Sequence, residues 1–157
     1  MISRRTVITA AGLSAIAALA PASAFAKYEV ELSDAEWRKR LSPAAYRVLR
    51  QAGTETPFTS PLNNEHRSGV FSCAGCKLPL FTSKTKFDSG TGWPSFWAPL
   101  RGAVAVDRDS TLGMVRTEVH CRRCGGHLGH VFDDGPPPTG KRYCMNGVAM
   151  IFTPRSL

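Results

Sequence analysis

The 157-residue sequence lacks the features that mark several classes of protein. It has a formal net charge of +8 but no run of lysine or arginine, and its basic residues are not interleaved with aromatics, so we expect no nucleic-acid binding. It has no low-complexity tract, and its only internal repeat is a short cysteine motif that occurs twice. From Pro57 onward it has no helical period of useful length, which excludes an all-helical protein. The one long apolar run is residues 7–20.

Residues 1–26 have the pattern of a signal peptide. Arg4 and Arg5 precede the apolar run, which is short for a bilayer span, and Ala24-Phe25-Ala26 forms a small-residue cleavage site. The adjacent arginines favour the twin-arginine export route. We therefore predict cleavage after Ala26, with Ala24 as an alternative, and a periplasmic or otherwise extracytoplasmic protein without stable membrane association. An uncleaved membrane anchor is the competing interpretation.

Removing 26 of 157 residues leaves 131, a length typical of one domain, and lowers the formal charge from +8 to +6 because the segment carries two arginines and no acid. Residues 27–157 are therefore predicted to form a single domain. Ser33 followed by Glu36 predicts the start of one short helix, and Ser42-Pro43 predicts a second that ends near Gln51. The rest predicts strands, at 69–72, 103–107, 114–120 and 142–152, and a proline-rich loop at 133–140.

Four of the five cysteines form two CxxC pairs, Cys73 with Cys76 and Cys121 with Cys124. A gap of two residues lets both sulfurs face one ion, and two such pairs complete a tetrahedral shell with no open position. The spacing predicts one structural Zn²⁺ per chain. Two disulfides remain an alternative in an oxidising compartment, and a thioredoxin-like redox pair is a weaker one.

Cys144 is the cysteine left over. On a strand, Arg142, Cys144 and Asn146 would share one face, so that a guanidinium could stabilise the thiolate and an amide could donate to a developing charge. These are the surroundings of a nucleophile. A buried, inert cysteine is an equally weighted alternative.

His127 and His130 follow the second cysteine pair directly. They would face opposite sides of a regular strand, but Gly129 permits a bulge that turns both toward one pocket, where either could donate a proton. Surface or core histidines are the alternative. Residues 87–97 concentrate aromatics around Trp93, which could either hold a methyl-sulfur group or belong to a small satellite core.

Together these residues resemble the B-type methionine sulfoxide reductases, which reduce the R epimer of methionine sulfoxide. The similarity extends from Leu32 to Phe152 and combines several motifs in order. They are Trp37 and Leu41, Gly53-Thr54-Glu55 with Pro57-Phe58-Thr59, both cysteine pairs, Gly92-Trp93-Pro94-Ser95-Phe96, the segment GGHLGHVF and Arg142-Tyr143-Cys144.

The resemblance implies a mainly β fold of two antiparallel sheets with short N-terminal helices and a structural zinc remote from the active site. It implies that the Cys144 thiolate attacks the sulfoxide of an oxidised protein while a histidine protonates its oxygen, which leaves a sulfenic acid. The residues implied are Cys144, His127, His130 and Asn146 for catalysis, and Trp93, Arg142 and Phe132 for substrate binding.

The chain departs from many family members in two respects. Met145 and Gly147 replace isoleucine and serine after the cysteine, which alters packing more than chemistry. The chain also has no further cysteine to resolve the sulfenic acid, which predicts direct reduction by a thioredoxin-like protein or a small thiol. A zinc-dependent protein-binding module and a periplasmic thiol-disulfide exchanger are the competing functions.

Overall fold

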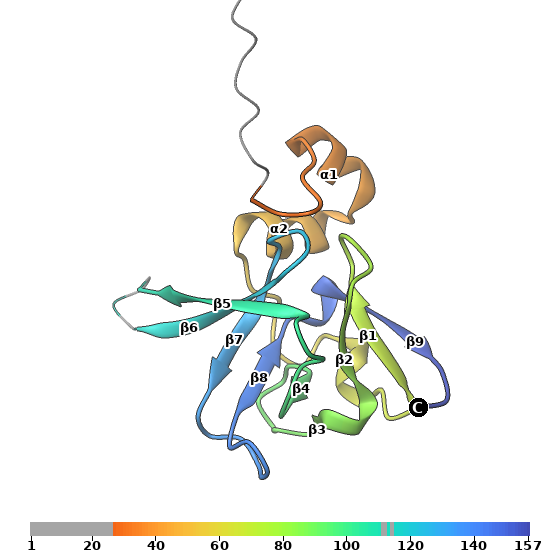
Figure 1. The fold of residues 1–157 in the computed structure, drawn as a ribbon, viewed down its shortest axis with the longest axis vertical. Helices are drawn as coiled ribbons and strands as arrows, with labels where there is room; N and C mark the ends of the chain where they lie inside the picture. The colour runs from red at the N-terminus through yellow and green to blue at the C-terminus, as the bar shows by residue number, and fades with distance from the viewer. Residues whose placement is uncertain (1–26, 111–112, 114) are drawn as a thin grey trace, which may run out of the picture.

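The computed structural model describes residues 27–110, 113 and 115–157, so the predicted signal peptide lies outside the described residues. Two antiparallel sheets make up the body, and two short helices pack at one end of them (Figure 1). Within the described ranges, no helix combines the length and apolarity needed to cross a membrane. The predicted fold class is confirmed.

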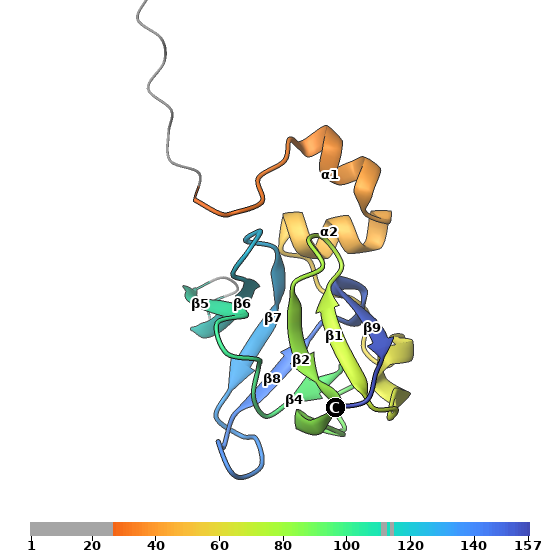
Figure 2. The ribbon, with the colours of Figure 1, turned by 45° about the vertical axis from the view of Figure 1, so that its right-hand side comes forward.

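Both predicted helices are present, α1 at Asp34–Arg40 and α2 at Pro43–Gln51. Ser33 and Glu36 form a reciprocal capping box at α1, and the Ser42 hydroxyl accepts from the Ala45 amide at the start of α2. These local hydrogen bonds explain why the sequence located both helices. Helix α2 packs against strand β7 and the 3₁₀ turn η4, as Figure 2 shows from the side.

The strands divide unevenly between the two sheets. The three-stranded sheet has the order β2 (Pro79–Thr82), β1 (Gly69–Cys73) and β9 (Met150–Pro154). The six-stranded sheet has the order β3 (Lys86–Phe87), β4 (Ser95–Phe96), β8 (Arg142–Met145), β7 (His127–Phe132), β6 (Arg116–Cys121) and β5 (Val104–Asp109). The 3₁₀ turns η1 (Pro61–Asn64), η2 (Ser83–Thr85) and η4 (Gly147–Ala149) link these elements.

The strand predicted at 142–152 is wrong as a single element. It breaks after Met145 into Asn146 and η4, and its two halves, β8 and β9, belong to different sheets. The break has a physical cause, since the carboxylate of Glu55 accepts hydrogen bonds from the amides of Gly147 and Val148 and so replaces a strand partner. The proline-rich segment at 133–140 forms no helix or strand, as predicted.

The predicted strand at 114–120 corresponds to β6, although Met114 lies outside the described residues. Strands β2, β3, β4 and β7 were not among the predicted strands. The core lies where the two sheets and α2 meet, and its aromatic centre is a stack of Phe81 on Phe96 with Phe71 edge-on. The largest fully buried side chains also include Leu80, Leu128, Met145, Val48 and Val119.

Candidate active site and metal centre

Cys144 lies in the middle of the six-stranded sheet, opposite Ser95 of β4 on one side and His130 of β7 on the other. His130 in turn lies opposite Glu118 of β6. Residues directly opposite each other on paired strands project from the same face of a sheet. The register therefore places a thiol, an imidazole and a carboxylate in one row on one face.

The bulge expected at Gly129 is present. Val119 pairs with Gly129 and the next residue, His120, pairs with His127, so that Leu128 is an extra residue in β7. Gly129 has a φ of 155°, and a Cβ there would lie 2.1 Å from the Cys144 carbonyl oxygen, which only glycine avoids. As a result the rings of His127 and His130 meet edge to face, with their centroids 5.5 Å apart.

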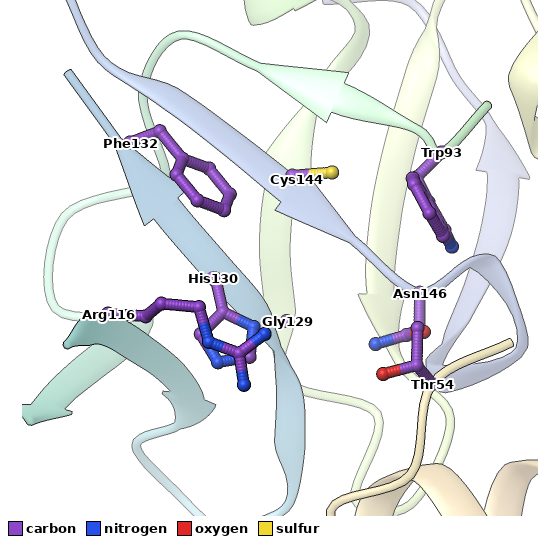
Figure 3. Close-up of a pocket in the computed structure, with 8 residues that line it drawn as sticks. All are labelled: Thr54, Trp93, Arg116, Gly129, His130, Phe132, Cys144 and Asn146. Carbon is purple, nitrogen blue, oxygen red and sulfur yellow. The ribbon is translucent and has the colours of Figure 1, made fainter. Parts of the chain in front are cut away.

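A cavity of about 170 Å³ opens over this row. The Cys144 sulfur points toward the indole of Trp93, and the ring of Phe132 lies on the other side of the cysteine (Figure 3). The eight lining residues are Thr54, Trp93, Arg116, Gly129, His130, Phe132, Cys144 and Asn146. His127, which was predicted to act here, is buried behind His130 and does not line the cavity.

Each histidine has a carboxylate partner that fixes its ring. His130 Nε2 lies 2.8 Å from Asp109 Oδ2, which also accepts from Arg116 at 2.7 Å, and His127 Nδ1 lies 2.6 Å from Glu118 Oε1. Burial lowers the pKa of His130, and the hydrogen bond with Asp109 only partly opposes that effect. The environment of His130 therefore favours the neutral imidazole.

The surroundings of Cys144 favour the thiol in the resting protein. Burial raises the pKa of Cys144, although the Thr91 hydroxyl, 3.8 Å from the sulfur, and the Arg142 guanidinium act in the opposite direction. Arg142 donates two hydrogen bonds of 2.8 Å to Asp134 and stacks over the ring of Phe132 at 4.5 Å. Its charge is thus shared with a carboxylate, so it stabilises the thiolate less than the sequence suggested.

We predict that alkylation of Cys144 by iodoacetamide accelerates with pH through an apparent pKa above the ordinary thiol value of 9.0. Only the thiolate reacts, and burial delays its formation. Arg142→Ala should move the apparent pKa further upward, because the guanidinium lowers it. The measurement is the rate of mass increase of the metal-loaded protein, and an inflection near neutral pH would refute the assignment.

Asn146 is buried beneath the cavity, and hydrogen bonds to the main chain occupy both ends of its amide. Oδ1 accepts from the Glu55 amide at 2.9 Å, and Nδ2 donates to the Leu128 carbonyl at 3.0 Å. The side chain predicted to be catalytic therefore fixes the bulged strand and the segment before η1 beside the pocket.

Glu55 is the main residue to which the sequence assigned no role, although it belongs to the motif Gly53-Thr54-Glu55. Besides its carboxylate contacts with η4, its carbonyl oxygen accepts from Trp93 Nε1 at 3.1 Å. One residue thus joins the indole, Asn146 and the turn after Cys144. Thr54 was likewise quoted only within that motif, and Arg116 and Asp109 were missed, because a single charged or hydroxyl side chain carries no spacing signal that would assign it to the site.

Glu55→Ala should lower the free energy of unfolding by about 2–4 kcal/mol, because two buried amides lose their acceptor. Urea unfolding at neutral pH measures this loss. Asp133→Ala is the control, since the exposed Asp133 carboxylate pairs with the exposed side chain of Lys141 and should contribute less than about 1 kcal/mol. Equal losses in the two variants would contradict the role given to Glu55.

The four paired cysteines converge at the helical end of the molecule. The sulfurs of Cys73 and Cys124 lie 3.8 Å apart, those of Cys76 and Cys121 lie 3.5 Å apart, and all four are within 4.8 Å of one another. Tetrahedral Zn–S bonds of about 2.3 Å require sulfurs about 3.8 Å apart, so the cluster fits such an ion. The chain therefore has a four-cysteine centre that could hold a metal.

The protonation of the cluster also fits a metal centre. Hydrogen bonds among the four cysteines raise the pKa of Cys73 and Cys124 and lower the pKa of Cys76 and Cys121, so in the absence of a cation the four groups do not ionise together. Several thiolates in one buried site need a cation to offset their repulsion. The predicted ligand set is thus brought together in three dimensions.

Comparison with known proteins places this site in a family. The model of the SelR domain matches residues 41–154. A peptide methionine sulfoxide reductase MsrB of Agrobacterium fabrum is 59% identical over 127 residues, which cover 80% of this chain and 94% of the relative. The Pseudomonas putida W619 protein of that name is 57% identical over 121 residues, 76% of this chain and 91% of the relative. A protein of the same name from Leptospira interrogans is 53% identical over 126 residues, which cover 80% of this chain and 96% of the relative.

These matches cover the strands and loops that build the cavity and the cysteine cluster. The chain belongs to the SelR-domain family, that of the B-type methionine sulfoxide reductases. The resemblance seen in its sequence motifs is confirmed.

Proposed function

We propose that the protein reduces the R epimer of methionine sulfoxide in oxidised proteins, with Cys144 as the nucleophile. The observation that carries the proposal is the position of Cys144, with its sulfur directed toward Trp93 and His130 opposite it across the strands. The names of the relatives support the same reaction. A zinc-dependent binding module gives no reason for a thiol in such a pocket, and a disulfide exchanger would need its CxxC pairs free of metal.

The directions of the Cys144 and His130 pKa shifts define the proposed steps. The resting pair is a Cys144 thiol and a neutral His130, so the thiol proton passes by way of the imidazole to the sulfoxide oxygen as the sulfur attacks. The sulfoxide sulfur gains two electrons and the cysteine sulfur loses two. The oxygen ends on Cys144 as a sulfenic acid, and methionine is released. His130 is the proposed donor because it lines the cavity, whereas His127 supports it from behind.

The aromatic side chains are proposed to hold the substrate. The indole of Trp93 offers an apolar surface to the methyl group of the sulfoxide, because methyl and sulfur groups pack favourably on aromatic rings. Phe132 closes the opposite side, with Arg142 stacked upon it. This arrangement directs the sulfoxide oxygen away from the indole and toward the polar side of the pocket.

The decisive experiment is incubation of the protein with each epimer of a capped methionine sulfoxide in the presence of dithiothreitol. We expect methionine from the R epimer and none above background from the S epimer. Turnover of the S epimer alone, or of neither, would refute the proposed function.

We propose Zn²⁺ as the ion of the four-cysteine centre, held by Cys73, Cys76, Cys121 and Cys124. Four sulfur ligands select zinc or iron, and a closed shell without an open position suits a structural zinc. The bound ion would join the turn after β1 to the turn between β6 and β7. It would therefore stabilise the two sheets from a distance and take no part in the reaction.

We propose that recycling uses an external thiol. Cys144 is the only cysteine outside the cluster, and a zinc ligand that left to resolve it would loosen the fold. A thioredoxin-like protein or a small thiol therefore attacks the sulfenic acid, forms a mixed disulfide with Cys144 and releases water. A second thiol then frees the enzyme.

We propose that the protein is exported by the twin-arginine route and that cleavage after Ala26 yields the mature chain. Residues on the mature side of this point contribute to the fold, since the Tyr28 amide donates to Glu31 and the Val30 amide donates to the Arg123 carbonyl beside the cysteine cluster. Cleavage there leaves these contacts intact. N-terminal sequencing of protein from the extracytoplasmic fraction should begin at Lys27, and full-length chain confined to the cytosol would refute the proposal.

A further inference from the structure

A second cavity, of about 180 Å³, is lined in part by Trp93. Because Trp93 also lines the catalytic pocket, the two cavities adjoin at this residue. The second cavity has apolar walls from Phe58, Phe87 and Pro94. Its remaining lining includes polar and charged side chains, those of Asn63, Asn64, His66, Lys86 and Asp88. Apolar walls with nearby amide groups suit a piece of polypeptide, which has both an apolar side chain and main-chain hydrogen-bonding groups.

Phe58 is an unusual residue at the rim of this cavity. Its side chain is 73% exposed, and its backbone has a φ of 65°, a left-handed conformation that bulky residues rarely adopt. Such strain persists only where surrounding contacts enforce it, and it is concentrated at functional sites. The structure thus holds a large phenyl ring in solvent at a conformational cost.

The contacts that enforce this conformation come from the loop that carries Trp93. The Phe58 amide donates to the Gly92 carbonyl at 2.7 Å, and a Cβ on Gly92 would lie 2.8 Å from the Phe58 nitrogen. The Asn63 side chain donates to the same Gly92 carbonyl at 3.0 Å, and Lys86 Nζ donates to the Asn63 carbonyl at 2.8 Å. The main chain of Phe58 is therefore tied to the residue next to the indole, which places the start of its side chain at the rim of the second cavity.

We propose that the second cavity and Phe58 form a binding subsite for an apolar side chain that flanks the methionine sulfoxide of a polypeptide substrate. The inference rests on the proposed function. The sulfoxide side chain occupies the pocket over Cys144, and side chains two residues apart in an extended segment are about 7 Å apart on one side, a spacing that lets the second pass the edge of the indole. The ring of Phe58 covers that second side chain and removes it from water.

The test compares three R-sulfoxide substrates with dithiothreitol as reductant. One is a short peptide with leucine two positions to either side of the sulfoxide, the second has serine at those positions, and the third is N-acetyl methionine sulfoxide amide. We expect the full-length metal-loaded protein to favour the leucine peptide over the serine peptide by about tenfold in kcat/KM, the effect of burying part of one leucine.

Two variants remove the ring. Phe58→Ala and Phe58→Gly should reduce the preference to less than about twofold, which would leave less than about 0.4 kcal/mol of the effect. Both should leave turnover of the capped amino acid unchanged. Glycine accepts a φ of 65° without strain, so Phe58→Gly keeps the fold even if alanine disturbs the loop. Ile151→Ala is the control, because Ile151 is 40% exposed on β9 of the other sheet.

Several results would overturn the subsite. They are a preference that persists in both variants, an equal loss with the capped amino acid, an effect seen only when thioredoxin replaces dithiothreitol, and a change from dimer to monomer in sedimentation. The third would assign the surface to the reductant and the fourth to a second copy of the chain. A wild-type protein inactive on all three substrates would instead refute the proposed function itself.

Discussion

Cys144→Ser should abolish the reduction of methionine sulfoxide, with a loss of at least about three orders of magnitude, the size seen when an enzyme loses its nucleophile. A serine hydroxyl has nearly the shape of the thiol but neither its nucleophilicity nor its redox chemistry. The half-buried side chain should still fit beside Thr91, so the fold and the metal content should be unchanged. The measurement is single-turnover formation of methionine from the R epimer.

The control for this variant is Cys124→Ser, which removes a different cysteine. Turnover retained by Cys144→Ser, with normal metal content, would exclude Cys144 as the nucleophile. Turnover lost together with metal and thermal stability would mean that the substitution acts through the fold.

Cys124→Ser should have the largest effect on stability. Metal binding contributes on the order of 10 kcal/mol to domains built on four-cysteine zinc sites, a figure comparable with the whole stability of most domains. Cys124 is buried, and its sulfur lies 3.8 Å from that of Cys73, which belongs to the other pair. Losing one ligand therefore weakens the link between two turns that are distant in the sequence. We expect less than stoichiometric zinc by elemental analysis and a urea midpoint reduced to the point where much of the protein is unfolded.

Chelation of the metal from the unmodified protein should reproduce that loss, and restoring Zn²⁺ should reverse it. Stoichiometric zinc and unchanged unfolding in Cys124→Ser would show that the cluster is no metal site. Two disulfides in the purified protein, detected by mass, would support the alternative left open by the sequence.

The parts of the fold that the sequence predicted are those specified by local chemistry. Ser33 with Glu36 and Ser42 with Pro43 act within one helical turn, so both helices could be located. The cysteine spacing and the bulge at Gly129 are likewise encoded in a few consecutive residues. Strands β3 and β4 have two residues each, too short for an alternating pattern to be read.

The parts that could not be predicted depend on contacts between distant segments. The break after Met145 is caused by Glu55, which approaches Gly147 from 92 positions away. Asp109 fixes His130 from 21 positions away, and only the pairing of β5 with β6 and of β6 with β7 brings them together. The sequence also could not show that the pKa of Cys144 is raised. Burial raises it more than Arg142 lowers it, and burial depends on the whole pocket.

Mass spectrometry after one equivalent of R-sulfoxide, without reductant, tests the central claim most directly. The claim is that Cys144 accepts the sulfoxide oxygen and has no partner thiol in the chain. It predicts a protein heavier by one oxygen atom, with the added mass at Cys144 and trapped there by a sulfenic-acid reagent. A protein of unchanged mass that has released methionine, or one lighter by two hydrogen atoms with a disulfide from Cys144 to a cluster cysteine, would contradict it.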